Sequence, residues 1–289
     1  MTQPVVVRSR AELDVVLAPH RAAGADVALV PTMGALHDGH AALLRRASAQ
    51  AAVVVCSVFV NPTQFGSGED LSRYPRDLGA DLDRCAREGV RVVFAPDVDT
   101  VYPEGLGGGV VVDPGPLGDR LEGAVRPGHF RGVLTVVAKL FGLVRPTTAV
   151  FGAKDYQQLV LVRRLARQLF LDVEVLDVET VREPDGLALS SRNAYLSPAE
   201  RRLAPALANA LSAGARCEAA GPAAVESAAR AALAIVPDID VDYLVVTDPE
   251  LGPAPQVGAG RLLVAARLGS TRLLDNTAVH LGAVQAEGT

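Results

Sequence analysis

The 289-residue chain contains no Trp, three Cys, and only two Lys among its 28 basic residues. Because the Cys residues are odd in number and widely spaced, we expect buried free thiols in a reducing compartment. The formal net charge of −5 argues against nucleic acid or an anionic membrane as the main partner. No apolar run approaches the roughly 18–20 residues of a membrane-spanning helix. The first residues also lack the basic segment and apolar stretch of a secretory signal, so we expect a cytoplasmic protein.

Three common motifs of α/β enzymes are missing as well. The chain has no Gly-x-x-x-x-Gly-Lys-[Ser/Thr] phosphate loop, no Gly-x-Gly-x-x-Gly dinucleotide turn and no Gly-x-Ser-x-Gly nucleophile elbow. A nucleotide site in this chain must therefore be built in another way.

The scarcity of Lys and Met draws attention to two segments. Lys154 lies in Phe-Gly-Ala-Lys-Asp-Tyr, and Met33 is the only Met besides the initiator. Arg is a wide planar group, whereas the compact ammonium of Lys suits a single phosphate oxygen. Each segment begins where an apolar run ends and a helical pattern starts. We therefore predict a nucleotide-phosphate site at the ends of strands.

Short β-branched apolar runs alternate with helical patterns over the first 180 residues. Strands that are apolar on both faces are typical of a parallel sheet covered by helices. The predicted strands are residues 27–30, 53–60, 91–95, 149–151 and 173–178, and the predicted helices are 41–51, 78–88, 132–143 and 155–169. This alternation predicts a Rossmann-like, doubly wound α/β domain over residues 1–180. The Gly- and Pro-rich stretch 101–128 is interpreted as a long excursion or lid.

The pattern changes after residue 181. Ser197, Pro198 and Glu200 form a helix-start signature, with Ser197 as N-cap and Glu200 closing a capping box. The predicted elements are helices 199–213 and 223–235, followed by strands 241–246, 261–267 and 272–275 with 277–281. We expect a smaller α+β domain over residues 181–289.

The first candidate site is His37-Asp-Gly-His40, after the strand at 27–30. Asp38 is the expected N-cap, and Gly39 allows a ligand to approach the backbone. Two imidazoles at a helix N-terminus, itself an anion site, would suit a phosphate whose charge grows in the transition state. Two other readings stay open: the rings only cap or pack at the turn, or they bind a metal, although no third ligand lies nearby.

Three further segments carry polar side chains at element ends. Asn61 and Gln64 follow the second strand, where neutral amides recognise hydroxyl and carboxylate groups, unless they only form a polar turn. Lys154 and Asp155 open the helix that carries Gln158, one turn later. The run Ser-Ser-Arg-Asn at 190–193 is similar to a phosphate clamp, although such runs are usually plain loops.

In combination and in this order, these segments resemble the pantothenate synthetase (pantoate–β-alanine ligase) family of the nucleotidylyl-transferase superfamily. The resemblance rests on Pro-Thr-Met-Gly-Ala-Leu-His-Asp-Gly-His, Phe-Val-Asn-Pro-Thr-Gln-Phe, Phe-Gly-Ala-Lys-Asp-Tyr-Gln-Gln, Ser-Ser-Arg-Asn, Gly-His-Phe-Arg-Gly at 128–132 and Arg-Leu-Leu-Val-Ala-Ala-Arg-Leu-Gly at 261–269. It runs through essentially the whole chain. Two departures are minor: the family often has Glu at the position of Ala153 and Met at that of Leu189.

The resemblance implies a two-step reaction. ATP and (R)-pantoate give pantoyl adenylate and pyrophosphate, and β-alanine then attacks the adenylate to give pantothenate and AMP. Mg²⁺ accompanies ATP, with no protein ligand assigned; Asp77, Asp81 and Asp83 could approach it, but a solvated helix face explains them equally. A homodimer is also implied.

The resemblance assigns roles to individual residues. The ATP-binding residues it implies are Met33, Gly34, Ala35, Leu36, His37, Asp38, Gly39, His40, Gly152, Ala153, Lys154, Asp155, Val181, Leu189, Ser190, Ser191 and Arg192. Of these, His40, His37, Lys154, Ser190, Ser191 and Arg192 are the candidate catalytic residues, and His40 is the general acid or a stabiliser of charge on the leaving pyrophosphate. Gln64, Gln158 and Asn61 are the candidates for pantoate and β-alanine. The second domain, with its loop at 190–192, is expected to close and exclude water.

Two alternatives belong to other classes. Another adenylyltransferase of the superfamily would transfer AMP to a phosphate acceptor and would need a basic acceptor pocket. A regulatory nucleotide-binding protein without catalysis would have lost His40, Lys154 or Arg192, and all three are present.

Overall fold

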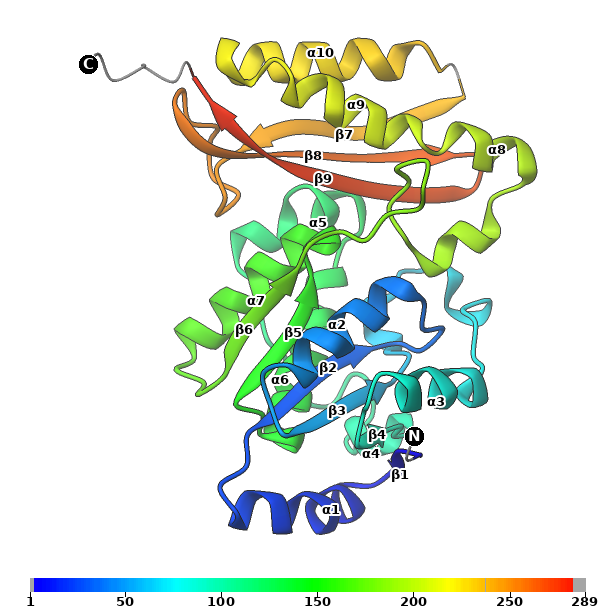
Figure 1. Ribbon diagram of the computed structural model, residues 1–289, viewed down its shortest axis with the longest axis vertical. Coiled ribbons are helices and arrows are strands. Elements are labelled where there is room, and N and C mark those ends of the chain that lie inside the picture. Colours follow the sequence, from blue (N-terminus) through cyan, green and yellow to red (C-terminus); the bar gives the residue numbers. More distant parts are fainter. Residues whose placement is uncertain (1–2, 237, 283–289) are drawn as a thin grey trace. The chain divides into compact units, whose positions relative to one another are not determined.

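The computed structural model of the chain describes residues 3–236 and 238–282 (Figure 1). Residue contacts divide it into two compact units. The first unit runs to Ala153 and resumes over Gln157–Thr180, and the second consists of Lys154–Tyr156 and the chain from Val181 onwards. Three residues from the middle of the chain therefore pack with its C-terminal part.

The first unit is built on a six-stranded parallel sheet with the order β1-β4-β3-β2-β5-β6. Its strands are β1 Val5–Val7, β2 Val27–Thr32, β3 Val53–Val58, β4 Val92–Phe94, β5 Thr148–Gly152 and β6 Glu174–Val178. The central strands are buried on both faces, as their continuous apolar sequences require. The predicted doubly wound α/β fold is confirmed.

Helices connect these strands. They are α1 Arg10–Ala22, α2 Asp38–Ser48, α3 Leu78–Arg87, α4 Val98–Val101, α5 Glu122–Val125, α6 His129–Val144 and α7 Tyr156–Gln168, with 3₁₀ turns η1 Pro62–Gln64, η2 Asp70–Ser72, η3 Pro116–Asp119 and η4 Ala153–Asp155. Of these elements only residues 154–156, in η4 and at the start of α7, belong to the second unit. The excursion predicted at 101–128 thus contains two helical turns. Sequence reasoning missed β1, which has only three residues, and α1, although Ser9 and Glu12 form a readable capping box.

The order of the strands reverses beside β2. The chain steps outward through β3 and β4 on one side, whereas β5 pairs with β2 on the other. Ligands of open α/β sheets bind beyond the carboxyl ends of the strands at such a switch point. The carboxyl ends of β2 and β5 lead into the segments that begin at Met33 and Ala153.

The second unit is a three-stranded antiparallel sheet, β7-β8-β9, with helices on one face (Figure 1). Its elements are η5 Ser191–Tyr195, α8 Pro198–Leu203, α9 Ala206–Ala215, η6 Glu218–Ala220, α10 Pro222–Ala234, β7 Ile239–Thr247, β8 Gly258–Leu268 and β9 Thr271–Leu281. Leu207 and Leu211 of α9 and Val225 of α10 belong to one buried cluster with Leu244 and Leu262 of the sheet. The predicted α+β character is confirmed.

The single helix predicted over 199–213 is wrong. The structure divides it into α8 and α9, and Pro205 occupies the N-cap of α9. Proline has no backbone N–H to donate and its ring collides with the preceding turn, so one continuous helix is disfavoured there.

Two of the thiols predicted to be buried, Cys56 and Cys85, are buried, whereas Cys217 is half-exposed; all three are free. Among the described residues, no helix combines the length and the apolar character needed to cross a membrane.

Candidate functional site

The loop after β2 makes a sharp turn before α2. Gly34 and Ala35 both have positive φ, 80° and 52°, and the Gly34 N–H donates to the hydroxyl of Thr32 over 3.2 Å. A Cβ on Gly34 would lie 2.8 Å from a carboxylate oxygen of Asp81, so only glycine fits this close approach. The loop that contains Met33 to Leu36 is therefore fixed by backbone geometry.

Asp81, on α3, holds this loop through its carboxylate. It accepts hydrogen bonds from the backbone N–H groups of Ala35 (3.2 Å) and Leu36 (2.8 Å) and is only 3% exposed. Burial raises the pKa of Asp81, and the two amide donors oppose that shift. The solvated-face interpretation is wrong for this residue. Asp77 caps α3 by accepting from the N–H of Ala80, and Asp83 is exposed.

His37, and not Asp38, is the N-cap of α2, because the helix begins three residues earlier than predicted. Its Nδ1 accepts from the N–H of Gly39 over 3.1 Å, and Nδ1 of His40 accepts from the N–H of His37 over 3.2 Å. The two rings lie 4.1 Å apart between centroids. Since Nδ1 of each ring accepts an amide hydrogen, the proton of each neutral ring lies on Nε2.

A ring held through Nδ1 keeps a fixed orientation, and its proton lies on the other nitrogen, Nε2. Asp38, at the first helical position, instead forms an ion pair with Arg84, whose hydrogen bond lowers the pKa of the Asp38 carboxyl.

Asn61 organises the turn η1 that follows β3. It is 1% exposed, its amide nitrogen donates to Oε1 of Gln64 (3.1 Å) and to the carbonyl oxygen of Gly132 (3.2 Å), and its oxygen accepts from Tyr102 (2.7 Å) and Thr63 (3.0 Å). Asn61 thus forms the polar turn, in which it accepts from the N–H of Thr63, and it orients Gln64.

Gln64 links two predicted segments in the first unit. With Oε1 held by Asn61, its amide nitrogen faces Sδ of Met33 at 3.2 Å. The loop after β2 and the turn after β3 therefore meet through these side chains.

His129, Arg126 and Glu69 form a polar cluster beside Gln64, a role that the sequence analysis did not assign to them. His129, at the start of α6, contacts the carbonyl oxygen of Gln64 through Nδ1 at 2.8 Å, and Arg126 lies 3.0 Å from its Nε2. Arg126 also forms a two-point ion pair with Glu69, at 2.6 and 2.8 Å. Burial, and then the charge of Arg126, lower the pKa of His129 to about 4. His129 is therefore neutral near pH 7, donates from Nδ1 to Gln64 and accepts from Arg126.

Gln158 lies half-buried on α7, next to a residue with a structural role. Its neighbour Gln157 is buried, donates to the carbonyl oxygens of Leu117 (2.9 Å) and Arg120 (2.8 Å), and accepts from the N–H of Glu122 (3.0 Å). Gln157 secures the η3–α5 segment. Gln158 remains a candidate ligand from the sequence, and Gln157 is the residue with the structural role.

The second unit contains a pocket with basic side chains. It is lined by Lys154, Leu187, Ala188, Ser190, Arg192, Asn193, Leu207, Arg272, Leu273, Leu274 and Asp275. Three of the predicted phosphate-binding residues, Lys154, Ser190 and Arg192, thus share one pocket. Lys154 also lies 3.6 Å from the carboxylate of Asp155, with 20% of its side chain exposed.

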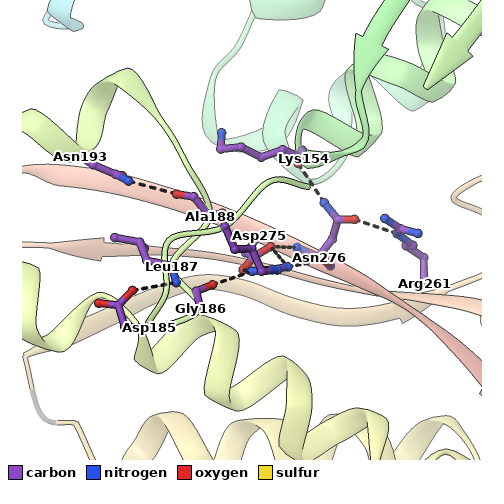
Figure 2. A network of polar contacts seen from close by, with 10 residues as sticks. Lys154, Asp185, Gly186, Leu187, Ala188, Asn193, Arg261, Asp275 and Asn276 are labelled. Atoms are coloured by element: carbon purple, nitrogen blue, oxygen red, sulfur yellow. Dashed lines mark hydrogen bonds and ion pairs between the residues drawn. The ribbon is translucent and has the colours of Figure 1, made fainter. Parts of the chain in front are cut away.

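The loop that carries Ser190 is shaped by a hairpin. The N–H of Leu189 donates to the carbonyl oxygen of Val181 over 2.9 Å, so these two predicted ATP-site residues are paired. The hydroxyl of Ser190 accepts from the N–H of Arg192 and begins η5, in which Ser191 is the first residue. Asn193 donates to the carbonyl oxygen of Ala188, as Figure 2 shows.

The remaining predicted residues lie at the junctions of elements. Gly152 ends β5 and Ala153 begins η4, while Gly39 lies in the first turn of α2. Within the described parts of the chain, no group of three or more His, Cys, Asp and Glu side chains is arranged to hold a metal ion.

Comparisons with known proteins identify the family of the chain. The profile of the family described as pantoate–β-alanine ligase matches residues 5–278. The chain is 58% identical to the pantothenate synthetase of Nocardioides sp. strain JS614, over 96% of this chain and 86% of that protein. It is likewise 58% identical to the pantothenate synthetase of Mycolicibacterium smegmatis, over 91% and 83% of the two chains.

Solved structures are similar as well. The crystal structure of pantothenate synthetase from Thermus thermophilus superposes with a TM-score of 0.89 at 49% identity, covering 94% of this chain and 98% of that one. The pantoate–β-alanine ligase of Francisella tularensis, described as complexed with "Beta-gamma ATP" and β-alanine, gives 0.78 at 30% identity, with coverages of 95% and 97%. On the family match, the identities and the shared fold, this chain belongs to the pantoate–β-alanine ligase family.

Proposed function

We propose that the chain joins (R)-pantoate to β-alanine in two steps driven by ATP. A carboxylate oxygen of pantoate attacks the α-phosphorus of ATP, and pyrophosphate leaves. The amine of β-alanine then attacks the acyl carbon of the adenylate and loses a proton, and AMP leaves with the bonding electron pair. The family match and the Francisella structure with a nucleotide and β-alanine support this reaction.

The observation that carries the proposal is the N-terminus of α2. There, backbone geometry fixes His37 and His40 through Nδ1, so each neutral ring has an Nε2–H to donate. We propose that His40 donates a hydrogen bond to an oxygen of the departing pyrophosphate. A preorganised donor at this position stabilises the negative charge that develops there. His37 and the amides of residues 33–40 complete the ATP site.

Phosphate contacts are assigned to the pocket of the second unit. In this pocket Lys154 supplies a point charge, Arg192 a planar guanidinium and Ser190 a hydroxyl. Ser191, the first residue of η5, is proposed to add a second hydroxyl donor. Gly152, Ala153, Asp155, Val181 and Leu189 provide the backbone and flanking contacts of the ATP site. The loop at 190–192 is proposed to close over the adenylate, since water would hydrolyse it.

Pantoate is assigned to Gln64 and Gln158. Neutral amides recognise a carboxylate and hydroxyl groups without holding the carboxylate in an ion pair that would weaken its nucleophilicity. Asn61 acts through Gln64, because its own amide is engaged within the protein. β-Alanine is expected to approach beside Gln64.

Mg²⁺ is proposed to accompany ATP, where it would neutralise charge on the phosphates. The residues present fit this role, because Mg²⁺ bound to phosphates needs few or no protein ligands, and Asp81 is already engaged by two amides. A cytoplasmic homodimer is proposed from the family resemblance.

The adenylyltransferase alternative requires a basic acceptor pocket. Near Gln64 the guanidinium of Arg126 is paired with Glu69, and His129 is neutral. These contacts favour an acceptor with a carboxylate over one with a phosphate dianion.

Product analysis with ATP and Mg²⁺ tests the reaction. Pyrophosphate and enzyme-bound pantoyl adenylate are expected with pantoate alone, and free AMP and pantothenate only after β-alanine is added. Intact ATP under these conditions, despite tight ATP binding, would show that the acceptor is a different molecule.

A further inference from the structure

Asn276, in the middle of β9, reaches the segment that carries Lys154. Its amide nitrogen donates to the backbone carbonyl oxygen of Lys154 over 2.9 Å, and the residue is only 3% exposed (Figure 2). This bond joins the strand of the second unit to the three residues, Lys154–Tyr156, that the first unit does not hold.

The orientation of the Asn276 amide is set by Arg261 on β8. Nε of Arg261 lies 2.7 Å from the amide oxygen of Asn276. An arginine nitrogen only donates, so the oxygen of Asn276 must face Arg261 and its NH₂ group must face Lys154. The amide has one chemically consistent orientation.

An adjacent ion pair, of which the carboxylate is buried and the arginine is partly exposed, fixes the backbone of Asn276. The Asp275 carboxylate, 4% exposed, accepts from two nitrogens of Arg182 at 2.6 and 2.9 Å and from the N–H of Asn276 at 2.7 Å. Since a paired, hydrogen-bonded buried carboxylate tolerates little displacement, the strand is rigid at this point.

Arg261 also contacts residues 154–156 directly, through the ring of Tyr156. Its guanidinium lies 4.2 Å from the centre of the Tyr156 ring, and the Tyr156 hydroxyl donates to the carbonyl oxygen of Pro249 over 3.0 Å. The segment is thus held at the carbonyl of its first residue and at the ring of its third.

We propose that Asn276, oriented by Arg261, is a positioning residue for Lys154. A lysine ammonium lies at the end of a flexible four-carbon chain, so its aim depends on how firmly its backbone is anchored. Asn276 anchors that backbone where the side chain enters the pocket with Ser190 and Arg192. This inference rests on the proposed role of Lys154 at phosphate. It also assigns a function to Arg261, the first residue of the Arg-Leu-Leu-Val segment at 261–264.

A double-mutant cycle with Asn276→Asp and Lys154→Ala tests the inference. The Asp variant keeps the acceptor for Arg261 but replaces the NH₂ donor with an oxygen that faces the Lys154 carbonyl. We expect single-turnover adenylate formation to fall about tenfold or more, in the range of losses from a misplaced group. The KM for ATP should rise while that for β-alanine stays unchanged.

In the Lys154→Ala background, Asn276→Asp should cost less than about twofold, a non-additive result. The carbonyl of residue 154 remains in that background, so a merely structural role of Asn276 would cost the same with or without the lysine. Equal losses in both backgrounds, or no loss in either, would overturn the inference. Normal activity of Lys154→Ala alone would instead overturn the proposed role of Lys154.

Two further variants serve as a replacement for Asn276→Asp and as a control. If Asn276→Asp does not fold, as judged by circular dichroism, Arg261→Lys replaces it in the same cycle with the same criterion, because lysine lacks the Nε that orients Asn276. Tyr156→Phe keeps the ring beneath Arg261 and loses the hydroxyl that bonds to Pro249, so its adenylation rate should match the parent. A tenfold loss in Tyr156→Phe would contradict anchoring through Asn276.

Discussion

His40 has a structural role in the cap of α2 and a proposed role in the chemistry. Its Nδ1 accepts the N–H of His37 and so completes the cap of α2, and the proton of the neutral ring lies on Nε2. Two different substitutions of His40 are needed to distinguish its effect on stability from its effect on the reaction.

We predict that His40→Gln and His40→Ala lose adenylate formation alike but differ in stability. Both should slow the single-turnover rate by at least about a hundredfold, the scale of losing one key transition-state donor. Glutamine at the third helical position still accepts at the cap, so only the Ala variant should lose about 1 kcal/mol of unfolding free energy. Quench-flow and urea denaturation measure the two effects. A wild-type rate in either variant would remove His40 from the chemistry.

At the scale of elements, the contact between η1 and α6 places Gln64. The two elements approach so closely that a Cβ on Gly132 would lie 2.3 Å from the carbonyl oxygen of Thr63. Gly142, on the same helix, is exposed, and a Cβ added there would have no neighbouring atom within 4 Å. The pair offers a matched comparison.

We predict opposite effects of the two Gly→Ala substitutions in α6. Gly132→Ala should destabilise the protein by about 1–3 kcal/mol, as overpacking does, and raise the KM for pantoate by displacing η1. Gly142→Ala should stabilise it by about 0.5–1 kcal/mol through helix propensity. Urea denaturation and steady-state kinetics measure both. Equal stability of the two variants would show that the position of η1 does not depend on the close approach of Gly132 to Thr63.

The same contact predicts a pH dependence through His129. Its folded-state pKa of about 4 lies below the unfolded value near 6.5, so the folded state binds fewer protons between these values. The stability that it contributes is therefore full above about pH 6.5 and is lost as the pH falls towards 4, by about 3 kcal/mol in total.

His129→Asn should flatten that dependence. The Asn amide nitrogen can donate to Gln64 as Nδ1 does, but it does not titrate. Urea denaturation of both proteins at several pH values between about 7 and 4.5 should show a steeper decline for the parent. Parallel curves would mean that His129 is not the titrating group.

At the scale of the whole molecule, the sequence predicted the elements that follow a repeating pattern and missed contacts between residues far apart in the chain. Buried parallel strands need continuous apolar residues, so five of the six strands of the first unit were identified. Contacts between distant residues leave weaker signals. Asp81 occupies an ordinary polar position of an amphipathic helix, and nothing nearby in sequence indicates that it accepts the amides of residues 35 and 36.

Other features were readable but were passed over. Pro205 signalled the break between α8 and α9, and adjacent polar residues Asp275 and Asn276 in an apolar strand signalled a buried polar network. The Met33, Gln64 and Lys154 segments were singled out because their residues suit nucleotide and carboxylate ligands. The link between Met33 and Gln64 became visible only in three dimensions.

The two lysines have a consequence for chemical footprinting. Lys139 lies over the ring of Tyr102, 5.0 Å from its centre, and Lys154 lines the pocket of the second unit. An amine-reactive acylating reagent therefore has two internal targets in the whole chain, and peptide mass spectrometry can follow each separately. We predict that ATP slows acylation of Lys154 several-fold and leaves Lys139 unchanged, so that Lys139 serves as an internal standard. Equal rates at Lys154 with and without saturating ATP would place the phosphates elsewhere.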